Sequence, residues 1–280
     1  MIDSVPPASA EQLISEFRRG EMVLLVLDQS DGGQTGVVAM AAECCEASHV
    51  TFMARQARGL VSLALTEARC EQLNLPSMVD PATSGAVKLS IEASTEIDTG
   101  ISAADRARTV RVAVAPDAKP SDLVQPGHIF PVATLSGGVL IRTGAAEAGV
   151  DLATLAGLTP AAVFAEVLDT HGELADASAL VAFADAHDLR VGRVTDLVDY
   201  RLNHYRTVDL IRSGQITTRH GEFMLSVYQE STQGHVHMAL SKGEFDQETP
   251  TLVRVHTVSS VRDLLAVSSA ERASWSIQDS

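Results

Sequence analysis

The sequence predicts a mixed fold of the α/β or α+β class, because segments typical of strands alternate with segments typical of helices. The run Met22–Leu27 is uninterrupted and apolar with charge on either side, which is typical of a strand buried on both faces. A polar, glycine-rich loop at 28–36 separates it from a second apolar run, Val37–Ala42. Beyond Arg206 short strand-like stretches replace this alternation. We therefore expect one large mixed domain followed by a small β-rich one.

Capping residues and turn residues place the individual elements. Ser9 and Gln12 form a capping box for a helix that Gly20 ends. Further helices are expected at 66–73, 102–112, 160–167, 177–187 and 195–206, with Thr159 as the cap and Pro160 at the first position of the third of these. Strands are expected at 216–229, 235–240 and 252–256. The change of pattern predicts two domains, 1–206 and 207–280.

Composition excludes several classes of function. The 280 residues carry 36 acidic and 21 basic side chains, a net charge of −15, which argues against nucleic-acid binding. The sequence contains no uncharged apolar stretch of about 18 residues, the length that a membrane-spanning helix needs. The N-terminus lacks the apolar run of a signal peptide. Three cysteines are too few for a disulfide scaffold. We therefore expect a cytoplasmic protein, for which a small phosphorylated ligand remains possible because a few arginines can form a local positive pocket.

A glycine turn at Gly100 leads into a predicted helix that begins with hydroxyl side chains. Exposed N–H groups at such a start favour an anion. Arg106 and Thr109 lie on the same side of the first turns, where they could complete an anion site. A capped helix with a solvated charged face explains the pattern equally well. The candidate anion-binding residues are Thr99, Ser102, Asp105, Arg106 and Thr109.

Three further residues are candidates for chemistry. His128 lies in a rigid turn between two prolines, where it could bind a ligand or exchange a proton, although a lone loop histidine is more often structural. Arg142 follows a strand-like apolar run and needs a phosphate or carboxylate partner. Glu166 is flanked by apolar residues and could act as a base if burial raised its pKa; the alternative is a buried salt bridge.

Two weaker patterns complete the survey. The glycine-rich loop at 28–36 matches neither a P-loop nor a dinucleotide fingerprint, and an ordinary turn is the better interpretation. His235 and His237 lie on one face of a predicted strand and could chelate a metal, but no third ligand is nearby.

Several segments, in order along the chain, resemble the 3,4-dihydroxy-2-butanone 4-phosphate synthase family. They are 52–60, Thr99–Thr109, Pro126–Pro131 and Gly138–Arg142. The resemblance covers roughly residues 10–206 and implies a three-layer fold with a mixed sheet. It also implies conversion of ribulose 5-phosphate with Mg²⁺, and a homodimer with sites at the subunit interface. Residues 215–256 resemble the opening of GTP cyclohydrolase II without its zinc-binding cysteines, so we expect a truncated remnant without that activity.

The resemblance assigns roles to the candidate residues. Glu166 stands at the position of the acid/base glutamate, and His128, Arg142 and the 99–109 segment stand where the family binds the sugar phosphate. Gly33 and Ala145 occupy the positions of the family's metal ligands. Because Mg²⁺ prefers hard oxygen donors, we expect a lost metal site and no cofactor.

This pattern leads to three functional hypotheses. The first is a diverged protein that binds a sugar phosphate and performs metal-independent acid/base chemistry of the lyase or isomerase type, with Glu166 and His128 as acid and base. The second is a non-catalytic paralogue that regulates or scaffolds a flavin-pathway enzyme. The third is residual 3,4-dihydroxy-2-butanone 4-phosphate synthesis.

Overall fold

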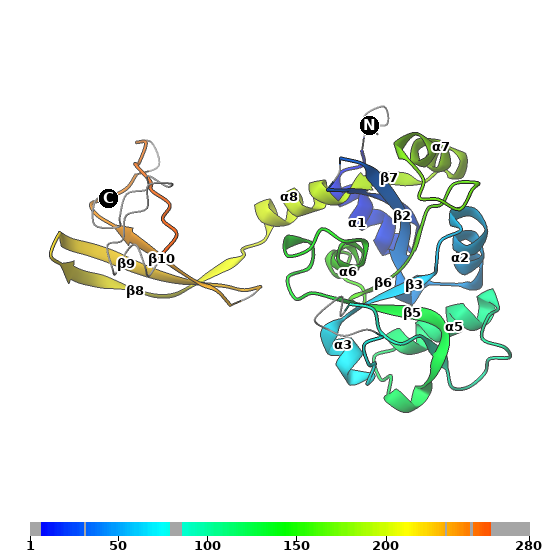
Figure 1. Ribbon diagram of the computed structural model, residues 1–280. Helices are drawn as coiled ribbons and strands as arrows, with labels where there is room; N and C mark the ends of the chain where they lie inside the picture. Colours follow the sequence, from blue (N-terminus) through cyan, green and yellow to red (C-terminus); the bar gives the residue numbers. More distant parts are fainter. Residues whose placement is uncertain (1–6, 31, 79–85, 233, 247–248, 259–280) are drawn as a thin grey trace, which may run out of the picture. The chain divides into compact units, whose positions relative to one another are not determined.

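The computed structural model describes residues 7–30, 32–78, 86–232, 234–246 and 249–258 (Figure 1). By their internal contacts the residues form two compact units. The larger comprises Met1–Ile211 with Tyr228–His237, and the smaller comprises Arg212–Val227 with Met238–Ser280. The predicted domain boundary at 206 lies five residues before Ile211, where the chain first passes from the larger unit to the smaller one. This boundary stays a prediction.

A mixed seven-stranded sheet is the centre of the larger unit. Its strand order is β4-β5-β3-β6-β2-β1-β7, in which β3 runs parallel to β5 and β1 runs parallel to β7. The other neighbouring pairs are antiparallel. The strands are β1 (Val23–Asp28), β2 (Gln34–Ala41), β3 (Ser62–Thr66), β4 (Ile91–Ala93), β5 (Leu123–Thr134), β6 (Ala161–Glu166) and β7 (Arg190–Arg193).

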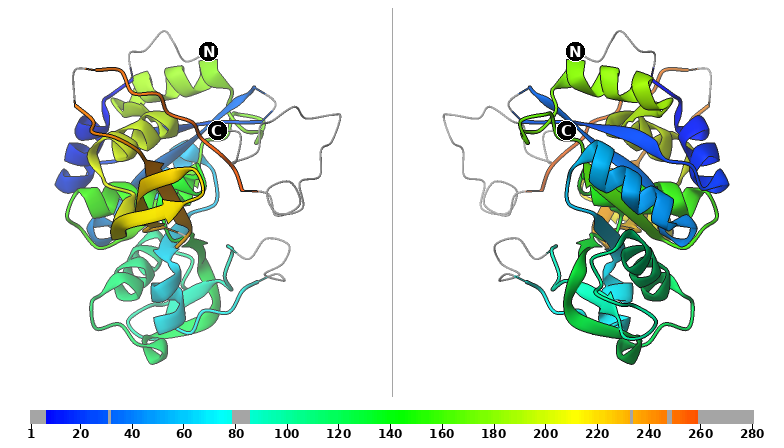
Figure 2. Two further views of the ribbon diagram at one scale, coloured as in Figure 1. Left: turned by 90° about the vertical axis from the view of Figure 1, so that its left-hand side faces the viewer. Right: turned by 90° about the vertical axis from the view of Figure 1, so that its right-hand side faces the viewer.

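Helices cover both faces of this sheet, which confirms the three-layer arrangement (Figures 1 and 2). Helices α2, α5 and α7 share one buried apolar cluster with one face, whereas α1, α6 and α8 share a second cluster with the other. The helices are α1 (Ala10–Arg19), α2 (Ala47–Phe52), α3 (Glu67–Gln72), α5 (Ala103–Val114), α6 (Ala145–Leu155), α7 (Ala177–His187) and α8 (Val194–His204). Short helical turns lie at η1 (Ala42–Cys44), η2 (Met53–Ala57), η3 (Pro120–Asp122) and η4 (Gly138–Leu140).

The local sequence signals explain the first elements. Ser9 and Gln12 form the reciprocal capping box of α1, and Gly20 ends the helix with φ of +76°. The first four residues of β1 are buried. Val23 and Leu25 face the α1/α6/α8 layer while Leu24 and Val26 face the α2/α5/α7 layer. A strand buried on both faces is therefore confirmed.

Several predicted elements are wrong. Residues 161–166 form the central strand β6 rather than a helix, because alternate residues pack into both apolar layers. Residues 138–140 form a helical turn rather than a strand. Residues 252–256 have no regular structure, and Leu252 is fully exposed. A short apolar run carries no periodicity that separates strand from helix.

A second, three-stranded sheet has the order β10-β9-β8. Its strands are β8 (Val208–Thr218), β9 (Gly221–Glu230) and β10 (Val236–Ser241). These strands confirm the predicted β-rich C-terminal part, but the single strand expected at 216–229 is wrong, because a turn at 219–220 divides it between β8 and β9. His235 forms an ion pair with Glu230 at 3.3 Å. Among the described residues, no helix is long and apolar enough to cross a membrane.

Candidate active site

His128 and Glu166 lie at the same end of the large sheet. In the pairing of the three central strands, Phe130 on β5 faces Ser62 on β3, and Ser62 faces Phe164 on β6. His128 comes two residues before this row and Glu166 two residues after it, which is the same direction because β5 and β6 are antiparallel. With β3 between them, the two strands are about 10 Å apart. A small ligand at this end could therefore contact both side chains.

Glu166 ends β6, where the chain leaves the sheet. Its backbone pairs with Val37 on β2, and Gly59 packs so closely on it that a Cβ atom there would stand 2.2 Å from the Glu166 carbonyl oxygen. The Glu166 carboxylate is half-buried and makes no hydrogen bond or ion pair with another described side chain. The salt bridge considered as the alternative is therefore absent from the described part of the chain, and the carboxylate remains available to a ligand.

The start of α5 is fixed by its own side chains. Ser102 caps the helix by accepting from the backbone N–H of Asp105, and the Asp105 carboxylate accepts from Gly100 N–H at 3.0 Å. Burial alone would raise the pKa of Asp105, but hydrogen bonds from Ser102 and the backbone hold it below its usual range. Thr109 is 1% exposed; its hydroxyl accepts from Ala93 N–H and donates to the Asp105 carbonyl. Thr109 thus holds α5 to β4.

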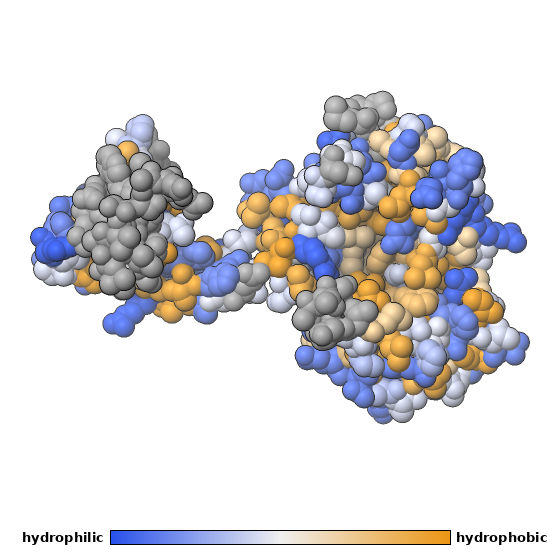
Figure 3. Space-filling view, viewed as in Figure 1, coloured by the Kyte–Doolittle hydropathy of each residue, from blue (hydrophilic) through white to orange (hydrophobic). Residues whose placement is uncertain are grey.

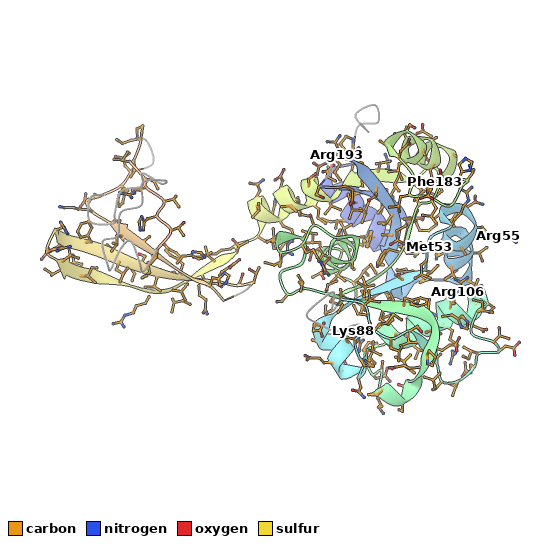
Figure 4. The ribbon with its side chains drawn as sticks, viewed as in Figure 1. Met53, Arg55, Lys88, Arg106, Phe183 and Arg193 are labelled. Carbon is orange, nitrogen blue, oxygen red and sulfur yellow. The ribbon has the colours of Figure 1, made fainter. Side chains whose placement is uncertain are left out.

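Arg106 has capacity for another hydrogen bond. Its Nε is buried and has no hydrogen-bond partner among the described residues, and burial lowers the pKa of its guanidinium. In Figure 4 Arg106, on α5, and Arg55, in η2, both lie at the right-hand side of the larger unit. An unpaired buried donor is costly. An anionic ligand would relieve that cost.

His128 has a carboxylate partner. The Glu92 Oε1 atom, on edge strand β4, lies 2.5 Å from His128 Nδ1. The pairing of β4 with β5 skips residues 125–128, so His128 sits in a bulge that contains a cis peptide bond at Pro126. The predicted turn is thus part of β5 and displays His128 at the sheet edge.

Arg142 is engaged by a buried carboxylate. Its Nε donates to Glu147 Oε1 at 2.9 Å, its Nη2 contacts the same oxygen, and Glu147 is 1% exposed. Arg142 Nη2 also donates to the Ala133 carbonyl at 3.3 Å. The strand from His128 to Ala133 spans about 16 Å. The structure therefore separates Arg142 from His128 within one chain.

The glycine-rich loop joins β1 to β2 beside Glu166. Gln29 N–H donates to the Gly33 carbonyl, and Gly36 accepts from Val167 N–H. In Figure 3 hydrophobic side chains gather in the part of this face where β2, β3 and β6 lie in Figure 1. Leu60, in the segment that enters β3, is 54% exposed. The loop, Glu166 and an exposed apolar residue thus share one end of the sheet.

The described residues offer few protein ligands for a metal ion. They contain no group of three or more His, Cys, Asp or Glu side chains placed to hold one. Glu166 supplies a half-buried carboxylate without a protein partner at this end of the sheet. Mg²⁺ commonly takes one or two protein carboxylates and completes its shell with water and substrate oxygens. A magnesium ion at this end of the sheet would therefore take most of its ligands from substrate oxygens and water.

Two partners of the candidate residues were missed at the sequence level. Glu92 lies 36 residues from His128, and only the strand pairing brings them together. Glu147 lies five residues from Arg142, in a helix α6 that was not predicted. The need of Arg142 for an anionic partner was the available signal.

Comparison with known proteins gives consistent matches. The model of the 3,4-dihydroxy-2-butanone 4-phosphate synthase family matches residues 11–200, and that of GTP cyclohydrolase II matches residues 210–280. A 3,4-dihydroxy-2-butanone 4-phosphate synthase from Pseudomonas syringae pv. tomato is 47% identical over 95% of this chain and 73% of its own length. The crystal structure of a two-domain synthase from A. baumannii is similar, with a TM-score of 0.82, 44% identity, and coverage of 93% of this chain and 77% of that one.

A further solved structure bears on the metal. It is a 3,4-dihydroxy-2-butanone 4-phosphate synthase in complex with two magnesium ions, with a TM-score of 0.66 and 34% identity over 70% of this chain and 98% of that one. This relative overturns the expectation of a protein without a cofactor, in which Gly33 and Ala145 mark a lost metal site. The closely similar synthases likewise contradict the expectations of metal-independent chemistry and of a non-catalytic paralogue. Both expectations were wrong because they rested on a few individual positions rather than on the similarity of the whole chain.

Proposed function

Because the chain belongs to the 3,4-dihydroxy-2-butanone 4-phosphate synthase family, we propose that it converts ribulose 5-phosphate to 3,4-dihydroxy-2-butanone 4-phosphate and formate. The observation that carries this proposal is 47% identity to a synthase over 95% of the chain. The arrangement at one end of the sheet supports it, since a carboxylate and an imidazole flank the position where a small substrate could lie.

Glu166 and His128 would exchange the protons of the reaction. Rearrangement of a keto sugar requires removal of a proton next to a carbonyl and its return elsewhere, which a positioned base and acid accelerate by about 10² to 10⁴-fold. Glu166 is suited to the base because its carboxylate has no protein partner among the described residues. His128 is suited to proton exchange because its ring is 42% exposed while Glu92 holds its Nδ1 side.

Arg106 is the proposed contact for the substrate phosphate. Its Nε is buried and without a partner in the described part of the chain. It lies one helical turn beyond the N-cap Ser102, and Thr99 precedes that cap by three residues. A phosphate there would also meet the positive end of the α5 dipole.

A homodimer would bring Arg142 into reach. Within one chain the Ala133 carbonyl that Arg142 contacts is about 16 Å along β5 from His128, too far for one five-carbon substrate to bridge. Leu60, before β3, and Ile101, before α5, are 54% and 56% exposed, so both are accessible to a second copy. We therefore propose that a site includes Arg142 of a second copy.

Magnesium, when bound, would act as a Lewis acid that polarises the substrate's oxygen atoms. Substrate oxygens and water would supply most of its ligands, and Glu166 keeps the role of the base. Cys44, Cys45 and Cys70 are free thiols, which supports a reducing compartment and the proposed cytoplasmic location.

Formate release from ribulose 5-phosphate with Mg²⁺, measured for the full chain, tests this proposal. Turnover that chelation of Mg²⁺ abolishes is the expected result. Glu166→Gln should lower kcat by at least about 100-fold. Glu173→Gln, an equal change of charge at an exposed position in the segment that follows β6, should leave kcat unchanged. A wild-type protein that releases no formate under these conditions would refute the proposal.

A further inference from the structure

The Glu92 side chain is placed against His128 by the edge of the large sheet. Its Oε1 lies 2.5 Å from His128 Nδ1, and its side chain is 15% exposed against 42% for His128. Glu92 is the middle residue of the three-residue strand β4, so its backbone is held by pairing with Val124 on β5. The carboxylate is therefore the anchored member of the pair and the imidazole the exposed one.

Two glycines make room for this contact. A Cβ atom on Gly100 would stand 1.3 Å from Glu92 Oε1 and 2.0 Å from its Cδ, so the carboxylate fills the space of a missing side chain. A Cβ atom on Gly127 would stand 2.2 Å from the Ile91 carbonyl and 2.6 Å from Glu92 N. The residue before His128 thus packs directly on the backbone of β4. Both packing contacts set where Glu92 and His128 stand.

Further hydrogen bonds fix the surrounding turns. Gly127 N–H donates to Ser90 Oγ at 3.1 Å, which holds the bulge of β5 to the chain before β4. Gly100 N–H donates to Asp105 Oδ2 at 3.0 Å, which holds the turn over the Glu92 carboxylate to helix α5. The two turns that enclose Glu92 are consequently each tied to a neighbouring element.

The chemistry of this pair is specific. A carboxylate that accepts a hydrogen bond from Nδ1–H fixes the tautomer and the orientation of an imidazole. The Nε2 atom is then the ring nitrogen left to exchange a proton with a ligand. Loss of the partner that orients a metal-bound histidine lowers activity by about 10 to 100-fold, and we take the same scale for His128.

We propose that Glu92 is a positioning residue, which holds His128 with its Nδ1 proton toward the sheet edge and its Nε2 toward the substrate. This inference rests on the proposed function for its effect on turnover. Its structural part, the protonation of Nδ1, is independent of turnover. Glu92 touches no reacting atom and acts through His128.

Long-range ¹H–¹⁵N spectra of the full chain with labelled histidine test the structural part. The signals of His128 are assigned by comparison with His128→Gln. In the wild-type protein Nδ1 should carry a proton, in the neutral or the charged ring. In Glu92→Ala the ring should change toward the tautomer mixture of a free imidazole. A neutral wild-type ring protonated only on Nε2, or a spectrum that Glu92→Ala leaves unchanged, would overturn the inference.

Steady-state kinetics test the functional part. Glu92→Ala should lower kcat by about 10 to 100-fold with KM changed by less than about 3-fold. Glu92→Gln, whose amide oxygen still accepts from Nδ1–H, should recover part of that loss. The matched control is Glu96→Gln, because Glu96 is 75% exposed and pairs with Arg108 on α5 rather than with His128; it should retain wild-type kinetics. Equal losses in Glu92→Gln and Glu92→Ala, or in Glu96→Gln, would contradict positioning. A wild-type protein without turnover would refute the proposed function and leave the spectra to decide this inference.

Discussion

Replacement of Arg142 by alanine should destabilise the protein strongly, because it leaves the Glu147 carboxylate buried without its cation. Glu147 is 1% exposed and is held by Arg142 Nε at 2.9 Å and by Nη2 of the same side chain. Removing one partner of a buried ion pair costs about 3 to 5 kcal/mol. Arg142 is itself 40% exposed, and Glu147 keeps a hydrogen bond from Leu135 N–H at 3.2 Å. We therefore expect the lower end, a loss of about 3 kcal/mol.

Urea denaturation followed by circular dichroism measures this loss as a difference in the free energy of unfolding. The double variant Arg142→Ala with Glu147→Gln removes the stranded charge, and it should be more stable than Arg142→Ala alone by at least about 1 kcal/mol. Arg19→Ala is the control, because Arg19 is 61% exposed and its surface pair with Glu16 should contribute little to stability. A loss below about 1 kcal/mol for Arg142→Ala, or no recovery in the double variant, would refute the reasoning.

Three further predictions concern backbone packing, acid stability and thiol reactivity. Gly59→Ala should destabilise the protein by about 1 to 3 kcal/mol in the same urea assay, because its Cβ would stand 2.2 Å from the Glu166 carbonyl oxygen; wild-type stability would show that this contact is loose. The pKa of Asp105 is lowered in the folded state, so its stabilising effect is present above about pH 4 and is lost as the pH falls through the folded value. Asp105→Asn should therefore flatten the fall of Tm between about pH 5 and 3, and an unchanged slope would contradict this. Burial raises the pKa of Cys45 to about 12, so iodoacetamide at pH 8 should modify Cys44 before Cys45 by mass spectrometry, and the reverse order would be incompatible with the structure.

The sequence predicted a helix correctly where the residues that start and end it lie within the helix itself or next to it. The capping box at Ser9 and Gln12 and the stop at Gly20 define α1 without help from the rest of the chain. Residues 161–166 were mistaken for a helix because strand β6 owes its form to neighbours on both sides of the sheet. Periodicity cannot supply that information for a run this short.

In the candidate site, too, some contacts were predictable from the sequence and others only from the three-dimensional structure. The requirement that Arg142 have an anionic partner followed from its apolar surroundings, and Glu147 meets it. The pairing of Glu92 with His128 joins residues 36 apart through the bulge of β5, which only the three-dimensional pairing reveals. The loss of metal was inferred from Gly33 and Ala145 alone, whereas similarity over the whole chain pointed to a synthase.

The most direct test of the proposed synthase activity uses uniformly ¹³C-labelled ribulose 5-phosphate with Mg²⁺ and the wild-type chain. In this reaction one carbon leaves as formate and four remain in the phosphorylated product. ¹³C NMR should therefore show labelled formate and labelled 3,4-dihydroxy-2-butanone 4-phosphate appearing at equal rates. A substrate that persists unchanged, or disappears without labelled formate, would contradict the account.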